Sequence, residues 1–185
     1  MTKPIKLQQK NKEMRKLIYL STIILAVLLT GCKLKGINYS MTGGTIPVEA
    51  KSFSVDFFQN KAPIVVPYLS SKFTEDLKNK LRDQSSLNEL TDMAGDLTFE
   101  GQITGYNMKP VNIQRNEVAA ANRLTITIRV KYTNPFNKKD SFDSSFSHYE
   151  DFPNDSPLSE YEEELIRKIT EKIIDDIYNK AFVNW

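Results

Sequence analysis

The chain has 185 residues with 25 Lys or Arg and 23 Asp or Glu, which gives a formal net charge of +2. Six of these basic residues and one of the acidic residues lie in residues 1–31, so residues 32–185 carry a formal net charge of −3. This mild acidity gives no support to nucleic-acid binding, and residues 32–185 are long enough for one domain with a hydrophobic core.

The chain begins with the basic and apolar parts of a secretory signal peptide. Lys12, Arg15 and Lys16 precede residues 17–29, an uncharged run that is short for a membrane span and typical of a signal peptide. A simple N-terminal membrane anchor is the alternative. Because the length and the flanks of the run favour a signal peptide, we predict one over residues 1–31.

The segment ends in a cleavage site that resembles a lipobox. Leu29-Thr30-Gly31-Cys32 places small residues before a cysteine, as lipoprotein signal peptidase requires. Cys32 is the only cysteine of the chain, so we predict that it is acylated and that no disulfide, thiolate metal site or catalytic thiol remains. Met14 is an alternative start, which would put residues 1–13 upstream of the true start.

The region after the cysteine changes from irregular to periodic sequence. We expect residues 32–50 to form a lipidated tether and the loop that enters the domain, and residues 51–185 to form a single domain. Residues 52–58 are predicted to form a half-buried strand. Their apolar side chains alternate at Phe53, Val55 and Phe57.

An amphipathic helix is predicted over residues 70–82. One apolar stripe recurs every four positions, at Leu69, Phe73, Leu77 and Leu81. Ser70 or Ser71 is expected to cap its N-terminus.

Three strands are predicted next. In residues 96–109, Gly101 and Gly105 indicate a bend or bulge, and Pro110 is expected to end the regular pairing. Residues 123–133 alternate apolar and polar side chains, as in an antiparallel sheet with one solvated face. After a turn at residues 134–140, a returning strand should complete a hairpin. It is marked by Phe142, Ser144, Phe146 and His148.

A second helix is predicted over residues 159–181, with a capping box formed by Ser159 and Glu162. Its buried stripe comprises Leu165, Ile166, Ile169, Ile173 and Ile177. The apolar residues that close the chain are expected to pack on the domain's own sheet; these are Tyr178, Phe182, Val183 and Trp185. We therefore predict an α+β fold, a two-layer domain with two α-helices packed on one face of a four-stranded, mainly antiparallel sheet.

Little catalytic chemistry is visible in the sequence. His148 is the only histidine and lies in a polar run at the end of a strand, so we expect neither a metal site nor a cofactor, and an enzyme is the least favoured reading. The basic residues are more informative. Lys109, Arg115 and Arg123 bracket the connection between two strands, where cations could hold phosphorylated lipid head groups. Ordinary solubilising charge is the alternative interpretation.

Further basic residues lie elsewhere on the predicted sheet. Lys138 and Lys139 fall on the hairpin turn. Arg129 and Lys131 are expected on the exposed face of the sheet.

Several ordered segments together resemble the Bacteroidota type of the LPS-assembly lipoprotein family LptE. They are the lipobox, Ile37-Asn38-Tyr39-Ser40, Thr42-Gly43-Gly44, Ile46-Pro47, Lys51-Ser52-Phe53-Ser54-Val55, the run from Gly95 to Gly101, the run from Ala119 to Ile126, and the tail from Asn179 to Trp185. The resemblance implies two helices against a four-stranded sheet. It also implies an outer-membrane lipoprotein that plugs the LptD β-barrel and helps to move lipopolysaccharide to the cell surface.

The resemblance also suggests a ligand for the basic residues between the two strands. Lys109, Arg115 and Arg123 become the candidates for lipopolysaccharide binding. In this group of bacteria an acidic run behind the acylated cysteine resembles a surface-export signal, and residues 33–36 have no acidic side chain, so we expect the protein to face the periplasm. The alternative function is a periplasmic lipoprotein that binds a glycan or lipid independently of a barrel.

Overall fold

The computed structural model describes residues 46–111, 121–155 and 157–183. The chain divides into two compact units, residues 1–41 and 42–185, and the described residues all belong to the second. The predicted signal peptide and Cys32 therefore lie outside the described residues. Among the described helices, none is both long and apolar enough to cross a membrane.

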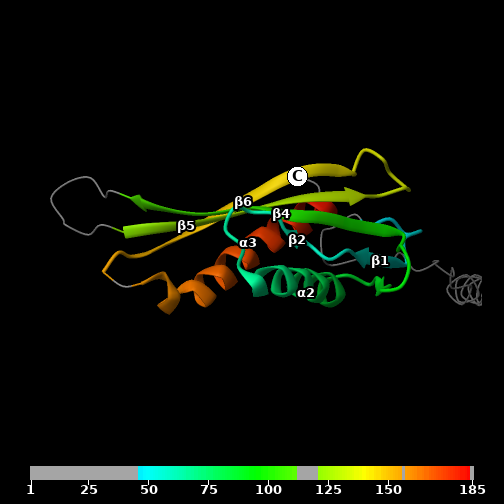
Figure 1. The fold of residues 1–185 in the computed structure, drawn as a ribbon. Coiled ribbons are helices and arrows are strands. Elements are labelled where there is room, and N and C mark those ends of the chain that lie inside the picture. Colours follow the sequence, from blue (N-terminus) through cyan, green and yellow to red (C-terminus); the bar gives the residue numbers. More distant parts are fainter. Residues whose placement is uncertain (1–45, 112–120, 156, 184–185) are drawn as a thin grey trace, which may run out of the picture. The chain divides into compact units, whose positions relative to one another are not determined.

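The described domain contains six strands, two α-helices and one short 3-10 turn (Figure 1). In chain order they are β1 (Ser52–Val55), β2 (Gln59–Asn60), α2 (Pro67–Gln84), β3 (Asn88–Glu89), β4 (Leu97–Val111), β5 (Ala121–Thr133), β6 (Phe142–Pro153), η1 (Leu158–Glu160) and α3 (Glu162–Phe182). This order confirms the predicted α+β class and both predicted helices.

The sheet differs from the prediction in size and direction. It has six strands in the order β3-β1-β4-β5-β6, with β2 also paired to β4, so the prediction of a four-stranded, mainly antiparallel sheet was wrong in detail. β1 pairs with β3 and β4 in parallel, and β2 pairs with β4 in parallel. The cause is α2, which returns the chain to the starting end of the sheet so that the next strand runs in the same direction.

Both helices cover the same face of the sheet, as Figure 1 shows. α3 contacts β5 and β6, whereas α2 contacts β1, β2 and β3. The apolar side chains of β5 are all buried beneath this layer, at Leu124, Ile126, Ile128, Val130 and Tyr132. The predicted stripes of α2 and α3 are buried in the same hydrophobic core, which confirms that the helices form a layer on the sheet.

The end of β1 breaks the predicted alternation. Phe53 and Val55 are buried as expected, but Phe57 is 59% exposed and Phe58 is fully buried instead. β1 ends at Val55, so the period of two no longer holds at Phe57. The ring of Phe58 packs edge-on against Phe73 of α2, with 5.0 Å between ring centroids.

The ends of the helices also differ from the predictions. α2 begins at Pro67, and Ser70 lies inside the helix, where its carbonyl accepts a hydrogen bond from the hydroxyl of Thr74. The predicted capping box of α3 is absent, because the helix begins at Glu162, whose carboxylate accepts a 2.6 Å bond from the hydroxyl of Tyr106. Burial raises the pKa of Tyr106, and this bond raises it further.

The two glycines of β4 produce the predicted irregularity. The pairing with β5 shifts register between Ile103 and Gly105, as expected for a bulge. At Gly101 a Cβ would lie 2.1 Å from the carbonyl oxygen of Arg129, so only glycine lets the strands approach. Pro110 does not end the pairing, since it lies opposite Asn122 and β4 continues to Val111.

The C-terminal apolar residues pack on the sheet as expected. Phe182 is buried between Phe99 and Tyr132, with ring centroids 6.2 Å and 6.0 Å away. The hydroxyl of Tyr178 donates a 2.6 Å bond to the carbonyl of Gln84 at the end of α2. Trp185 lies outside the described residues.

The carboxylate of Asp96 joins the beginnings of β1 and β4. Its Oδ2 accepts hydrogen bonds from the backbone N–H groups of Lys51, at 2.8 Å, and Ser52, at 3.0 Å, and from the hydroxyl of Ser52, at 2.9 Å. These bonds, led by that from Lys51, hold the pKa of Asp96 below its usual value.

Replacement of Gly101 by alanine should destabilise the domain strongly. Its methyl group would overlap both the carbonyl of Arg129 and the ring of Phe58, so we expect a loss of about 2 kcal/mol or more in the free energy of unfolding. Gly105→Ala is the matched control, because its Cβ would lie 3.1 Å from a side-chain atom of Thr127. Urea unfolding measures both; equal losses would contradict the close approach at Gly101.

Asp96 should make stability depend on acid pH. The pKa of Asp96 is lowered on folding. The carboxylate therefore contributes fully to the free energy of unfolding above its ordinary pKa of 3.8, and this contribution is lost as the pH falls through the lowered pKa. We expect Asp96→Asn to lower the melting temperature at neutral pH, and the difference from wild type to close at strongly acid pH. Asp92→Asn is the control, and a pH-independent effect of Asp96→Asn would refute this linkage.

Candidate functional site

The predicted lipopolysaccharide-binding residues meet at one end of the sheet, where β4 ends and β5 begins. Lys109 and Arg123 lie directly opposite each other in the antiparallel pair. Both belong to the face without helices, since Arg123 alternates with the buried Leu124. Arg115 lies outside the described residues. The structure therefore brings two of the three candidates together.

Arg123 is held in place by two residues of β6. Its Nε and Nη2 donate hydrogen bonds of 2.7 Å and 2.9 Å to the two oxygens of Asp151, and its guanidinium lies 3.7 Å from the ring centroid of Tyr149. The bond to Asp151 raises the pKa of Arg123 and lowers the pKa of Asp151. Nη1 takes no part in these two hydrogen bonds, so its N–H groups remain as donors for an anion.

Lys109 differs from Arg123 in its pairing. It is exposed, and within the described part of the chain it forms no ion pair. An anion placed between the two strands would therefore meet the ammonium of Lys109 and the remaining N–H groups of Arg123. A phosphate suits such donors, because charge-assisted bonds to its oxygens are strong.

The rest of the helix-free face is polar and charge-compensated. Arg129 donates two bonds of 2.8 Å to Asp143, and Lys131 lies 3.2 Å from Glu100. These pairs border a shallow cavity of about 250 Å³. The predicted exposure of Arg129 and Lys131 is confirmed, but each is neutralised by a neighbour.

A second set of cations lies at the opposite end of the sheet. Lys139, on the β5–β6 turn, and Lys180, near the end of α3, line a groove of about 570 Å³. The ammonium of Lys180 lies 4.8 Å from the ring centroid of Phe142 and 5.6 Å from that of Phe146. This groove combines aromatic rings with both donors and acceptors, since Asp140 and Asp176 also line it.

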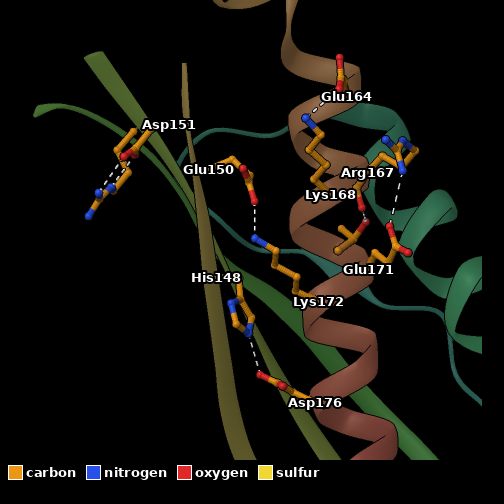
Figure 2. Close-up of polar contacts among 11 residues, drawn as sticks. His148, Glu150, Asp151, Glu164, Arg167, Lys168, Glu171, Lys172 and Asp176 are labelled. Carbon is orange, nitrogen blue, oxygen red and sulfur yellow. Dashed lines mark hydrogen bonds and ion pairs between the residues drawn. The ribbon is translucent and has the colours of Figure 1, made fainter. Parts of the chain in front are cut away.

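Figure 2 shows the polar contacts between β6 and α3. Nε2 of His148 lies 2.6 Å from Oδ2 of Asp176, and the ammonium of Lys172 bonds to the carboxylate of Glu150. These contacts lie at the rim of the two layers, where the side chains of His148 and Asp176 are 34% and 51% exposed. They join the helix to the outermost strand of the sheet.

The arrangement around His148 does not resemble a nucleophile activated by a base. The neighbouring Ser147 belongs to the other face of the sheet, where its hydroxyl lies 2.9 Å from that of Thr127. His148 is bonded to the carboxylate of Asp176, and no described hydroxyl bonds to its ring. Within residues 46–111, 121–155 and 157–183, no group of three His, Cys, Asp or Glu could hold a metal ion.

Sequence reasoning missed the residues that position Arg123. Tyr149 and Asp151 lie in a segment that we interpreted as the end of a strand and the start of a loop, whereas β6 continues to Pro153. The alternation of residues through Ser145 and Ser147 is the sequence signal that the strand continues to Tyr149 and Asp151. Extending the hairpin pairing along this strand would have placed Asp151 opposite Arg123.

Comparisons with known proteins identify one family. The family model described as "LptE: Lipopolysaccharide-assembly" matches residues 50–181. No curated protein sequence matches the chain.

Solved structures resemble the chain at low sequence identity. A minor lipoprotein from Acinetobacter baumannii is 13% identical, with a TM-score of 0.44 over 71% of this chain and 94% of that one. The rare lipoprotein B from Shewanella oneidensis is 11% identical, with a TM-score of 0.41 over 69% of this chain and 89% of that one.

The contact between α3 and the sheet should depend on apolar packing rather than on its ion pairs. Loss of the exposed pair in His148→Ala should change the free energy of unfolding by less than about 1 kcal/mol. Ile173→Ala, on the fully buried side of the same helix, should cost about 2–5 kcal/mol. Chemical denaturation compares the two, and a larger loss for His148→Ala would contradict this ranking.

Proposed function

The chain belongs to the LptE family of lipopolysaccharide-assembly proteins, and on this premise we propose that it is an outer-membrane lipoprotein that plugs an LptD-type β-barrel and supports its assembly. In this proposal Cys32 carries the lipid anchor and the domain faces the periplasm. The protein is a non-enzymatic partner in the transport of lipopolysaccharide to the cell surface.

The observation that carries the proposal is the extent of the family match. Residues 50–181 include every described strand and nearly all of α3, so the match covers the folded domain rather than one motif. The chemistry of the described residues is compatible with a binding role, because their charged side chains form ion pairs on the surface of a closed core.

The proposed contact with lipopolysaccharide lies at the end of the sheet that carries Lys109 and Arg123. Arg115, in the connection between β4 and β5, belongs to the same proposed cluster. Phosphate groups of the glycolipid would pair with these cations, while Asp151 and Tyr149 keep the guanidinium of Arg123 in a fixed orientation.

A second candidate function is a periplasmic lipoprotein that binds a glycan or lipid without a barrel. The groove beside Phe142, Phe146 and Lys180 favours it, because aromatic rings and hydrogen-bonding side chains together suit a sugar. Depletion of this protein from the cell distinguishes the two functions. Lipopolysaccharide that accumulates inside the cell and is lost from the surface supports the barrel partner, whereas normal surface lipopolysaccharide supports the alternative.

The barrel itself provides the direct test. The full-length acylated chain, purified from outer membranes in mild detergent, should retain an LptD-type barrel in a defined ratio. Cys32→Ala should lose the membrane anchor and recover much less barrel. Purification of the wild-type chain without any barrel would refute the proposed role.

Binding of lipopolysaccharide should depend on one end of the sheet. Removal of both charges in Lys109→Ala/Arg123→Ala deletes several charge-assisted bonds, so we expect affinity for purified lipopolysaccharide to fall roughly ten-fold or more. The matched control is Lys138→Ala/Lys139→Ala, which removes the same net charge at the opposite end. Titration at two salt concentrations measures both. Equal losses would contradict binding at the Lys109 end alone, and would indicate non-specific attraction or binding in the groove lined by Lys139.

A further inference from the structure

β6 is the last strand of the sheet, and one of its edges is open. It pairs with β5 in a continuous register from Ala121 opposite Pro153 to Tyr132 opposite Phe142. Among residues 46–111, 121–155 and 157–183, no strand pairs with its other side. The edge is long, since β6 has 12 residues, and no bulge interrupts it.

The pairing pattern determines which backbone groups of β6 face outward. The carbonyl of Phe99 accepts a bond from the N–H of Asp56, so Phe99 directs its backbone groups away from β5. In an antiparallel pair, the backbone groups of successive residues point alternately toward and away from the partner strand. Two opposed residues either both face each other or both face away from each other. Tyr132, opposite Phe99, therefore bonds to Phe142 on β6.

The same alternation continues along β6. Every second residue after Phe142 bonds to β5, and the residues between them direct both N–H and C=O to the open edge. These outward residues are Asp143, Ser145, Ser147, Tyr149 and Asp151. All five are exposed.

β6 carries acidic side chains but lacks the other features that usually protect an edge from pairing. It has no Lys or Arg and no proline before Pro153 at its end. Another open stretch of the sheet, the end of β4 beyond its pairing with β2, carries both Lys109 and Pro110. The β6 edge is therefore the longer and more regular of these two open stretches, and the one better suited to pair with another strand.

Charge distinguishes between the strands that could cover it. Asp143 and Asp151 lie near the two ends of β6 on the helix-free side, each paired inward with an arginine of β5. Their carboxylate oxygens retain further acceptor capacity toward the edge. A second copy in full antiparallel overlap would oppose Asp143 to Asp151, and opposed like charges destabilise a sheet.

The helix side of the edge has a different character. His148 and Glu150 are engaged by Asp176 and Lys172 of α3. Phe142 and Phe146 remain half-buried beside the groove, whose Lys139, Lys180, Asp140 and Asp176 balance in charge. On this side the two phenylalanine rings therefore offer apolar contact to a neighbouring strand.

We infer that the open edge of β6 binds an extended segment of a partner protein as an added strand, with basic side chains on the helix-free side and apolar side chains against Phe142 and Phe146. The inference rests on the proposed function, since the segment is attributed to the barrel partner. Backbone hydrogen bonds would supply affinity, and the two side-chain rows would supply specificity.

The test removes one outward N–H and leaves the fold intact. Ser145→Pro deletes an N–H that faces the edge, where proline is tolerated, and no described side chain bonds to Ser145. Ser145→Ala is the matched control because it keeps the N–H. With the full-length chain and the purified barrel, we expect Ser145→Pro to bind at least ten-fold more weakly and Ser145→Ala to bind like wild type. Circular dichroism and thermal unfolding verify that both variants fold.

Residue-resolved hydrogen exchange provides a second readout that needs no variant. In the isolated chain the amides of Ser144, Phe146 and His148 should be protected, whereas those of Ser145 and Ser147 should exchange rapidly. In the complex the rapid set should become protected. If the wild-type chain binds no barrel, the proposed function fails.

If the barrel binds but Ser145→Pro binds equally and the outward amides stay unprotected, the strand-addition inference fails alone. Protection that rises with protein concentration in the absence of the barrel would overturn it in favour of self-pairing.

Discussion

The structure depends on the burial of one face of β5 beneath α3. Five consecutive alternate side chains of this strand are inaccessible to solvent, and the isoleucine stripe of α3 lies over them. Each fully buried aliphatic side chain contributes about 1.5–3 kcal/mol through the hydrophobic effect. Because β5 is central among the long strands, this contact also determines the positions of β4 and β6 on either side of it.

The same constraint places the charged side chains of β5 on the other face of the sheet. Once the apolar side chains of β5 point to the helices, Arg123, Arg129 and Lys131 must point away from them. The strands next to β5 provide acidic partners for all three. The helix-free face is therefore polar with little net charge, and among its described cations Lys109 is the one that forms no ion pair.

This distribution relates the fold to the proposed role. A protein that lies inside a barrel needs a closed core and a polar surface, because the interior of an outer-membrane barrel is polar. The ends and edges of the sheet are then the places where binding can be selective. The Lys109–Arg123 end offers charge to an anionic glycolipid, and the edge of β6 offers backbone groups to a strand.

The sequence by itself determined the long elements, and the lipobox at Cys32 stays a prediction from sequence. Periodicity over ten or more residues identified both helices, the β5–β6 hairpin and the side of each that is buried, and Gly101 and Gly105 marked the bulge of β4. The tertiary structure alone decided the rest. β2 and β3 have two residues each, too few for any period, and their parallel pairing follows from the path of α2. The hydrogen bond between Tyr106 of β4 and Glu162 at the start of α3 joins elements far apart in the sequence, and it forms only when the helix packs on the sheet. The bonds between Arg123 and Asp151 depend on the full length of β6, which the sequence pattern left short.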